Sequence, residues 1–197
     1  MNVPLKWIFP MTCGCLGTWQ LYRLHQKKQF IERTRTALEH EPMNMPTDNL
    51  IKPFTKYRLN GKWSGEHLLV GPRACSVGDR RSVYGYTVIR HFISSDAEYL
   101  VNYGVLPRRE GHIQLGDDKD IVEIAVILDQ SERTYPWMKG SRNEDGTWNV
   151  KDYAGMAQQT SAVNLPLRLV SESRLIKPDP IASIPNRHFE YVLTWYG

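Results

Sequence analysis

The strongest constraint on the fold is a run of sixteen residues, 7–22, that contains no charged side chain. A helix of that length covers about 24 Å, against a hydrocarbon core of roughly 30 Å, so it spans a bilayer if Lys6 and Arg23 extend toward the headgroups. We therefore predict a membrane helix over residues 1–23 and a soluble domain over 24–197. The alternative is a helix in the core of a soluble β-rich binding module.

Basic residues follow this run directly. Residues 23–35 carry five Arg or Lys side chains against the single acid Glu32, which suits either anionic lipid headgroups or a solvated helix face. Apolar residues from Tyr22 to Leu38 predict that the first helix continues into water and ends near Pro42. Because basic residues are not interleaved with aromatic ones over the chain, we expect no nucleic-acid partner.

The body of the chain consists of short runs of β-type residues separated by turn residues. The predicted strands are 57–63, 67–70 (closed by a Gly71-Pro72 turn), 84–92, 98–106, 121–128 and 165–171, and a helix is predicted over 150–160. Short connections between sequential strands favour an antiparallel sheet or a partly closed barrel. The predicted fold class is α+β: an N-terminal membrane helix followed by an antiparallel β-rich soluble domain.

Motifs of catalysis are missing from the sequence. It contains no phosphate-binding glycine loop, no nucleophile elbow and no zinc-protease motif, so no enzyme signature is present. Three cysteines exclude a disulfide framework, and Cys13 and Cys15 lie in the apolar run, where thiols act as small hydrophobic side chains.

Two residues have chemistry that suits a binding site. His188 precedes an aromatic block containing Trp195 and Tyr196, and such aromatics belong at a membrane–water interface. A neutral imidazole there is suited to ligate a haem iron, or to form a hydrogen bond with a loop backbone. Arg73 is suited to hold a carboxylate such as a propionate, or is an ordinary surface arginine.

Six blocks, in this order, resemble the surfeit locus protein 1 family, the Shy-type cytochrome c oxidase assembly factors. They are Leu16-Gly17-x-Trp19-Gln20-x-x-Arg23, Glu66-x-Leu68-x-x-Gly71-Pro72-Arg73, Gly85-Tyr86-x-Val88, Val101-Asn102-x-Gly104-x-x-Pro107, Trp148-x-x-x-Asp152-x-x-x-Met156-Ala157 and Pro185-Asn186-x-His188-x-x-Tyr191-x-x-Thr194-Trp195-Tyr196-Gly197. The chain departs from the family at Tyr103, where arginine is usual, and at Val105, where an aromatic residue is usual. In the family a second membrane helix follows the last block, so one is expected after residue 197.

The resemblance implies a non-enzymatic assembly factor of the mitochondrial inner membrane, with its soluble domain in the intermembrane space. Its implied partners are the catalytic subunit of cytochrome c oxidase, other assembly factors and the membrane. The implied cofactor is haem a, with His188 as the iron ligand and Trp195 and Tyr196 as part of the wall. Trp19, Gln20 and Arg73 are the implied partner-binding residues. The alternative is a membrane-anchored scaffold that binds assembly intermediates without contacting haem.

Overall fold

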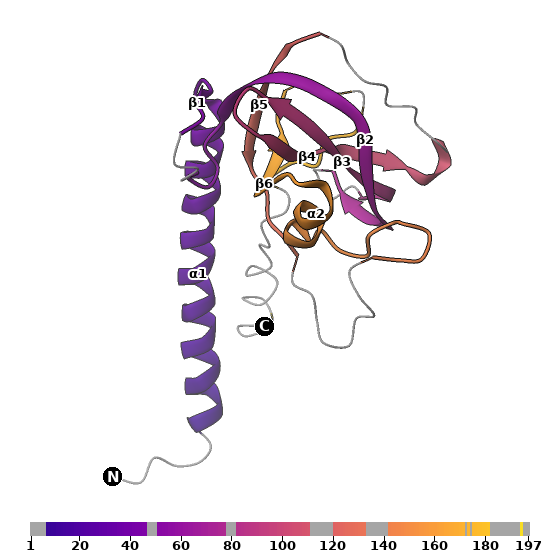
Figure 1. Cartoon of the computed structure of the whole chain (residues 1–197). Coiled ribbons are helices and arrows are strands. Elements are labelled where there is room, and N and C mark those ends of the chain that lie inside the picture. Colours follow the sequence, from indigo (N-terminus) through magenta and orange to yellow (C-terminus); the bar gives the residue numbers. More distant parts are fainter. Residues whose placement is uncertain are drawn as a thin grey trace.

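The computed structural model describes residues 7–46, 51–77, 82–110, 120–132, 142–171, 173, 175–181 and 194. The elements in chain order are α1 (Ile8–Glu39), β1 (Met43–Asn44), β2 (Tyr57–Ser76), β3 (Ser82–Ser94), β4 (Glu98–Pro107), the 3-10 turn η2 (Arg108–Glu110), β5 (Val122–Leu128), α2 (Tyr153–Thr160) and β6 (Val163–Leu169). This arrangement confirms the α+β class, the helix at the N-terminus and the predicted helix at α2 (Figure 1).

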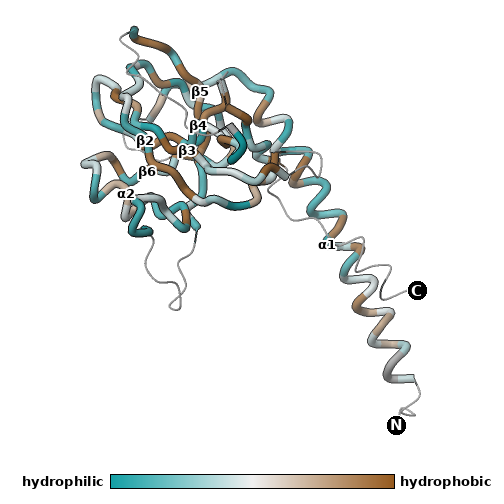
Figure 2. Tube along the Cα trace, turned by 90° about the vertical axis from the view of Figure 1, so that its right-hand side faces the viewer, coloured by the Kyte–Doolittle hydropathy of each residue, from teal (hydrophilic) through white to brown (hydrophobic). Residues whose placement is uncertain are grey.

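The strands of the described residues form one sheet in the order β1-β2-β3-β4-β6-β5, and a further pairing of β2 with β5 closes it into a barrel. Successive residues of β4 face opposite sides of this barrel. Tyr99, Val101 and Tyr103 pack in the larger core with Trp63 and Phe92, whereas Leu100 belongs to a second core. Figure 2 shows the hydrophobic residues concentrated in the strands.

The second core lies between the barrel and α2. It contains Val70, Ile89, Leu100, Trp148, Tyr153, Met156, Ala157 and Ala162. The first turn of α2 is capped by Asp152, whose Oδ1 accepts a hydrogen bond from the backbone N of Gly155 at 3.1 Å. Because three buried α2 residues, Tyr153, Met156 and Ala157, anchor the helix, the position of Tyr153 is fixed by packing.

The sheet is mixed, so the predicted antiparallel pairing holds for only part of it. The β1–β2 and β4–β6 pairs are parallel, while β2–β3, β2–β5, β3–β4 and β5–β6 are antiparallel. A parallel pair needs a long crossover. The segment between β4 and β6 supplies one, because it contains both β5 and α2.

The predicted strands 57–63 and 67–70 are parts of one strand, and the predicted Gly71-Pro72 turn is a bulge inside it. β2 runs through residues 57–76, with irregular register between Trp63 and His67 and between Val70 and Arg73. Gly71 adopts φ +121°, and a Cβ there would lie 2.9 Å from the Arg73 backbone N. The bulge accommodates a proline without ending the strand, so β2 continues as far as Ser76.

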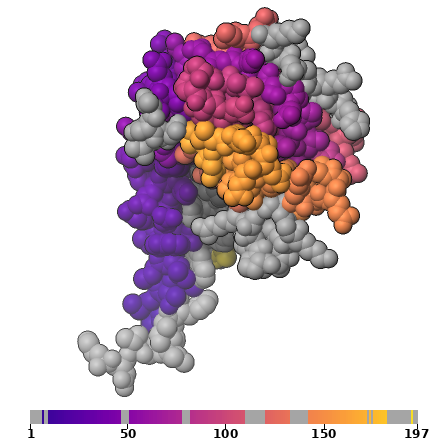
Figure 3. All heavy atoms as spheres, viewed as in Figure 1, coloured from indigo at the N-terminus to yellow at the C-terminus, as the bar shows by residue number. Residues whose placement is uncertain are grey.

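Helix α1 stands beside the barrel and extends well beyond it (Figures 1 and 3). It continues without interruption to Glu39, which confirms the predicted extension past Arg23. Strand β1 then joins it to β2, with the Met43 backbone N donating to the Lys56 carbonyl at 3.0 Å. Of the helices in the described residues, none is both long and apolar enough to span a bilayer.

Candidate functional site

A fully buried carboxylate, Asp129, lies at the centre of a polar cluster on the barrel. It follows the last residue of β5, and its backbone N donates to the Pro166 carbonyl at 2.8 Å. Its side chain accepts hydrogen bonds from four others: Asn102 Nδ2 at 2.9 Å, Tyr153 Oη at 2.8 Å, Lys151 Nζ at 3.2 and 3.3 Å, and Arg168 Nη2 and Nε at 2.5 and 3.1 Å. Both oxygens of the Asp129 carboxylate are therefore occupied as hydrogen-bond acceptors.

The topology brings these donors together from separate parts of the chain. Asn102 and Arg168 are register partners in the parallel β4–β6 pair. Arg168 also pairs with Ile127 of β5, two residues before Asp129. Tyr153 is the first residue of α2, and Lys151 lies just before the N-cap residue Asp152. The cluster therefore exists only when the barrel is closed and α2 is packed on it.

The surrounding groups determine the protonation states of Asp129 and Tyr153. Burial alone would raise the pKa of Asp129, but attraction to Lys151 and Arg168 and the hydrogen bonds from Asn102 and Tyr153 outweigh it and lower that pKa to about 2. Burial, together with the nearby Asp129 charge, raises the pKa of Tyr153 well above its usual value. Near neutral pH, Asp129 is therefore ionised and Tyr153 is a neutral donor.

A second ion pair joins the edge of this cluster. Both terminal nitrogens of the Arg73 guanidinium bind the Glu132 carboxylate, with Nη2 lying 2.6 Å from Oε1. Glu132 Oε2 also accepts from the backbone N of Lys151 at 3.3 Å, which links the two ion pairs. Burial lowers the pKa of Arg73, but the hydrogen bond and attraction to Glu132 raise it by more. Arg73 thus holds a carboxylate of its own chain.

The two ion pairs border a cavity of about 300 Å³. The lining residues come from β2, β3, β4 and β6 and from the loops next to them: Arg73, Ala74, Cys75, Ser76, Thr87, Asn102, Glu132, Lys151, Arg168 and Pro178. A cavity of that volume is at the lower end of the range for small-molecule sites. It is the strongest candidate site in the described residues, because charged side chains converge on it.

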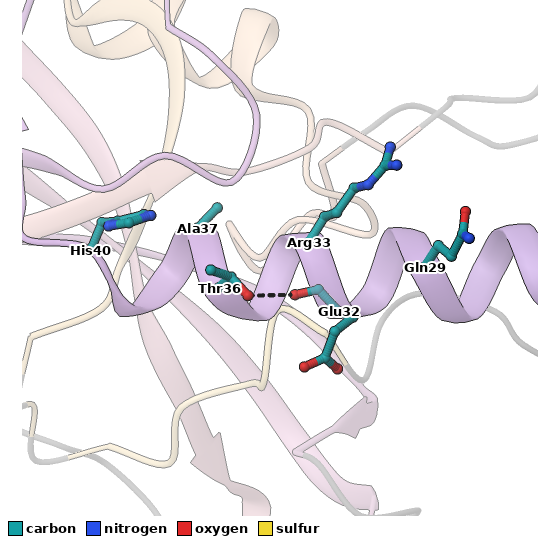
Figure 4. Close-up of a pocket in the computed structure, with 6 residues that line it drawn as sticks. All are labelled: Gln29, Glu32, Arg33, Thr36, Ala37 and His40. Carbon is teal, nitrogen blue, oxygen red and sulfur yellow. Dashed lines mark hydrogen bonds between the residues drawn. The ribbon is translucent and has the colours of Figure 1, made fainter.

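A second cavity, of about 530 Å³, lies along α1. Figure 4 shows five residues of α1 and its C-cap residue His40, with the Thr36 hydroxyl donating to the Glu32 carbonyl at 3.1 Å; the five are Gln29, Glu32, Arg33, Thr36 and Ala37. The charged ends of Glu32 and Arg33 point in opposite directions (Figure 4). Since its polar groups do not converge, this cavity is a weaker candidate site.

Some of the predicted site residues lie in the described part of the chain and others do not. Trp19 is 52% exposed on α1, whereas its neighbour Gln20 is 9% exposed and so is not available on the same face. His188, Trp195 and Tyr196 lie outside the described residues. Among the described residues no group of three or more metal-ligating side chains is assembled. The partner-binding and haem-binding roles stay predictions.

The two departures from the family pattern both lie in the barrel. The Tyr103 ring packs edge-on against Trp63, with ring centroids 5.1 Å apart. Its face lies 5.1 Å from the guanidinium carbon of the buried Arg90. Val105 is fully buried on β4. Both substitutions therefore concern packing in the barrel, and neither residue lines the polar cavity.

Sequence reasoning missed most of the cluster. Only Arg73 and Asn102 stood in a quoted motif. Asp129 and Lys151 are 22 residues apart and Lys151 and Arg168 are 17 apart, so the three share no short spacing. One available signal was a single acid directly after the apolar run 124–128, because a carboxylate at the end of a buried strand needs a partner.

Loss of the Tyr153 hydroxyl tests the energetics of the cluster. We expect Tyr153→Phe to lower the free energy of unfolding by about 1–1.5 kcal/mol, since a charged acceptor loses one donor while Asn102 and Lys151 still bind the same oxygen. Equilibrium unfolding in urea measures this change in the free energy of unfolding. Tyr84→Phe, at an exposed tyrosine, is the matched control and should change stability by less than about 0.5 kcal/mol. Equal effects of the two variants would contradict the assignment.

Comparison with known proteins gives the family. The sequence pattern of the SURF1 family matches residues 8–197. The chain belongs to the SURF1 family. Relatives include Surfeit locus protein 1 of Gallus gallus, 26% identical over 98% of this chain and 71% of the relative. The SURF1-like protein of Dictyostelium discoideum is 26% identical over 98% of this chain and 90% of its own length. Surfeit locus protein 1 of Homo sapiens is 26% identical over 98% of this chain and 73% of its own length. The resemblance drawn from the six sequence blocks is thereby confirmed.

Proposed function

We propose that this protein is a non-enzymatic assembly factor for cytochrome c oxidase that assists maturation of the catalytic subunit by handling haem a. The observation that carries the proposal is the match to the SURF1 family over residues 8–197, nearly the whole chain. The order of the six blocks supports it, because they are distributed along the domain and end in the block around His188.

The proposed location is the mitochondrial inner membrane, with the soluble domain in the intermembrane space and residues 1–23 in contact with lipid. Met11 and Tyr22 of α1 and its N-cap residue Trp7 fall on one helical face, and all three are exposed. Helices of soluble domains usually turn such side chains toward a core. Trp and Tyr with an apolar body and a polar tip suit the headgroup region, so this face supports attachment to a membrane.

Haem a enters the proposal as cargo, through His188 as an axial ligand and through Trp195 and Tyr196 as part of an apolar wall. These residues lie outside the described part of the chain. Neither of the cavities described above suits a porphyrin: the charged one is not lined by histidine, and the one along α1 has the charged Glu32 and Arg33 in its lining beside His40. The haem step therefore rests on the C-terminal block alone.

A second candidate function is a scaffold that binds oxidase assembly intermediates and never contacts haem. The exposed Trp19 of α1 favours it, since an aromatic side chain next to an uncharged helix segment is a suitable anchor for another protein. Such a scaffold would bind the same partners, the catalytic subunit and other assembly factors. The two functions differ in their dependence on His188.

Complementation separates these functions. Full-length wild-type protein, expressed in cells that lack this factor and are deficient in oxidase, should restore the haem a absorbance of mitochondrial membranes. His188→Ala should restore less than about a tenth of it, because loss of an axial ligand removes the iron's attachment. The exposed His25 of α1 provides the control, and His25→Ala should restore the wild-type level.

Carbonate extraction of the same membranes checks that each variant stays in the pellet as a membrane protein. Equal rescue by wild type and His188→Ala would favour the scaffold over haem handling. Failure of the wild type to restore oxidase would contradict both functions.

A further inference from the structure

Among the described residues, the charges at the cavity do not balance. Three cations, Arg73, Lys151 and Arg168, meet two carboxylates, Asp129 and Glu132, which leaves one positive charge among the described residues of the site. The side chains of Lys151 and Arg168 are only 11% and 12% exposed. Charges this far from water are ordinarily paired, so the cavity favours one further negative charge.

Arg168 and Lys151 have N–H groups left to bind a further anion. Arg168 holds Asp129 through Nε and Nη2, and its Nη1 has no hydrogen-bond partner among the described residues. The Lys151 ammonium has three N–H groups, of which Asp129 occupies two at most. Both groups bind the Asp129 carboxylate and line the cavity, so together they can receive a second carboxylate there.

An orphaned acceptor lies beside them. Asn102 is 2% exposed and lines the cavity, and its Oδ1 is buried without a hydrogen-bond partner in the described residues. Its amide orientation is fixed, because Asp129 is an ionised acceptor and so must face Nδ2. A buried acceptor left without a donor has a cost in stability. A ligand that carries a hydrogen-bond donor would remove that cost.

We propose that this cavity binds a small organic carboxylate that also carries a neutral hydrogen-bond donor such as a hydroxyl. Arg168 Nη1 and Lys151 receive the carboxylate, and the donor binds Asn102 Oδ1. Register pairing of Asn102 with Arg168 places the two residues side by side on adjacent strands, whose backbones lie about 5 Å apart. The single excess charge favours a monoanion over a phosphate dianion. The inference does not involve His188 or haem, so it stands apart from the proposed function.

The first test uses 3-hydroxypropanoate as the probe. Full-length protein in detergent should unfold at a higher temperature as the probe concentration rises, because a ligand of the folded state stabilises it by mass action. The neutral analogue 3-hydroxypropanamide should have no effect, and propanoate, which lacks the hydroxyl, should bind about tenfold more weakly. Equal shifts with acid and amide, no shift at tens of millimolar acid, or tighter binding of phosphate would each overturn the proposal.

The second test changes the charge without touching the cluster. Ser76 is exposed and lines the cavity at the end of β2. Ser76→Asp supplies the missing negative charge from within and should weaken calorimetric binding of 3-hydroxypropanoate by about tenfold or more. Ser76→Asn, of the same shape but neutral, should stay within about threefold of wild type. Equal affinities of the two variants would overturn the proposal.

Discussion

Asp129→Asn is expected to lower the free energy of unfolding by about 3–5 kcal/mol, because it leaves Lys151 and Arg168 buried with no opposing charge. The side chain keeps its size, so the loss reports on charge and not on packing. An amide also presents a donor to nitrogens that can only donate. Equilibrium unfolding in urea measures the change, and the same cluster predicts its dependence on pH.

The folded-state pKa of Asp129 is lowered from 3.8 to about 2. A carboxyl with a lowered pKa contributes stability above its unfolded-state pKa and loses it as pH falls through the folded-state value. We therefore expect roughly 2 kcal/mol of wild-type stability to disappear between about pH 4 and pH 2. Asp129→Asn lacks this step, so the two proteins should converge in stability over that range.

Glu123→Gln is the matched control. Glu123 pairs with Arg58 at 3.4 Å, but the two side chains are 55% and 39% exposed, and such surface pairs contribute about 0–1 kcal/mol. The same change from carboxylate to amide should therefore have little effect. If Asp129→Asn costs no more than Glu123→Gln, or if the wild type shows no added acid sensitivity, the buried cluster does not have the role assigned to it.

Gly85→Ala is expected to destabilise the barrel by about 3 kcal/mol. Gly85 lies in β3 between β2 and β4, paired with Arg73 and Pro107. A Cβ there would lie 2.1 Å from the carbonyl oxygen of Leu106, and backbone atoms of a paired strand cannot move aside without breaking the pairing. The urea concentration at the midpoint of unfolding should therefore fall. Binding of 3-hydroxypropanoate in the charged cavity should also be lost.

The control for this variant is Gly14→Ala in α1. A Cβ at Gly14 would meet nothing within 4 Å, and replacing glycine by alanine inside a helix is favourable by about 0.5–1 kcal/mol. The two substitutions should therefore have opposite signs. A Gly85→Ala protein as stable as wild type would show that β3 and β4 are not paired closely at this position.

The local elements were predictable because local patterns produce them. The uncharged run and the apolar residues after it predicted a helix that ends near Pro42, and α1 ends at Glu39. The β-type runs anticipated β3, β4, β5 and β6, with ends that differ by a few residues. What failed was the pairing of strands. Parallel contact of β4 with β6 depends on a crossover through β5 and α2, and no single run of residues encodes it.

Family membership, the N-terminal helix and the β-rich body follow from the sequence by itself, because motif order and hydrophobic periodicity are properties of neighbouring residues. The charged cavity was decided by the tertiary structure alone. Its polar cluster is built from separate segments, which contribute Asn102, Asp129, Lys151 and Arg168. In the sequence, nothing distinguishes any of the four from an ordinary polar residue. Only barrel closure and the packing of α2 remove them from water, and burial is what makes their charges matter.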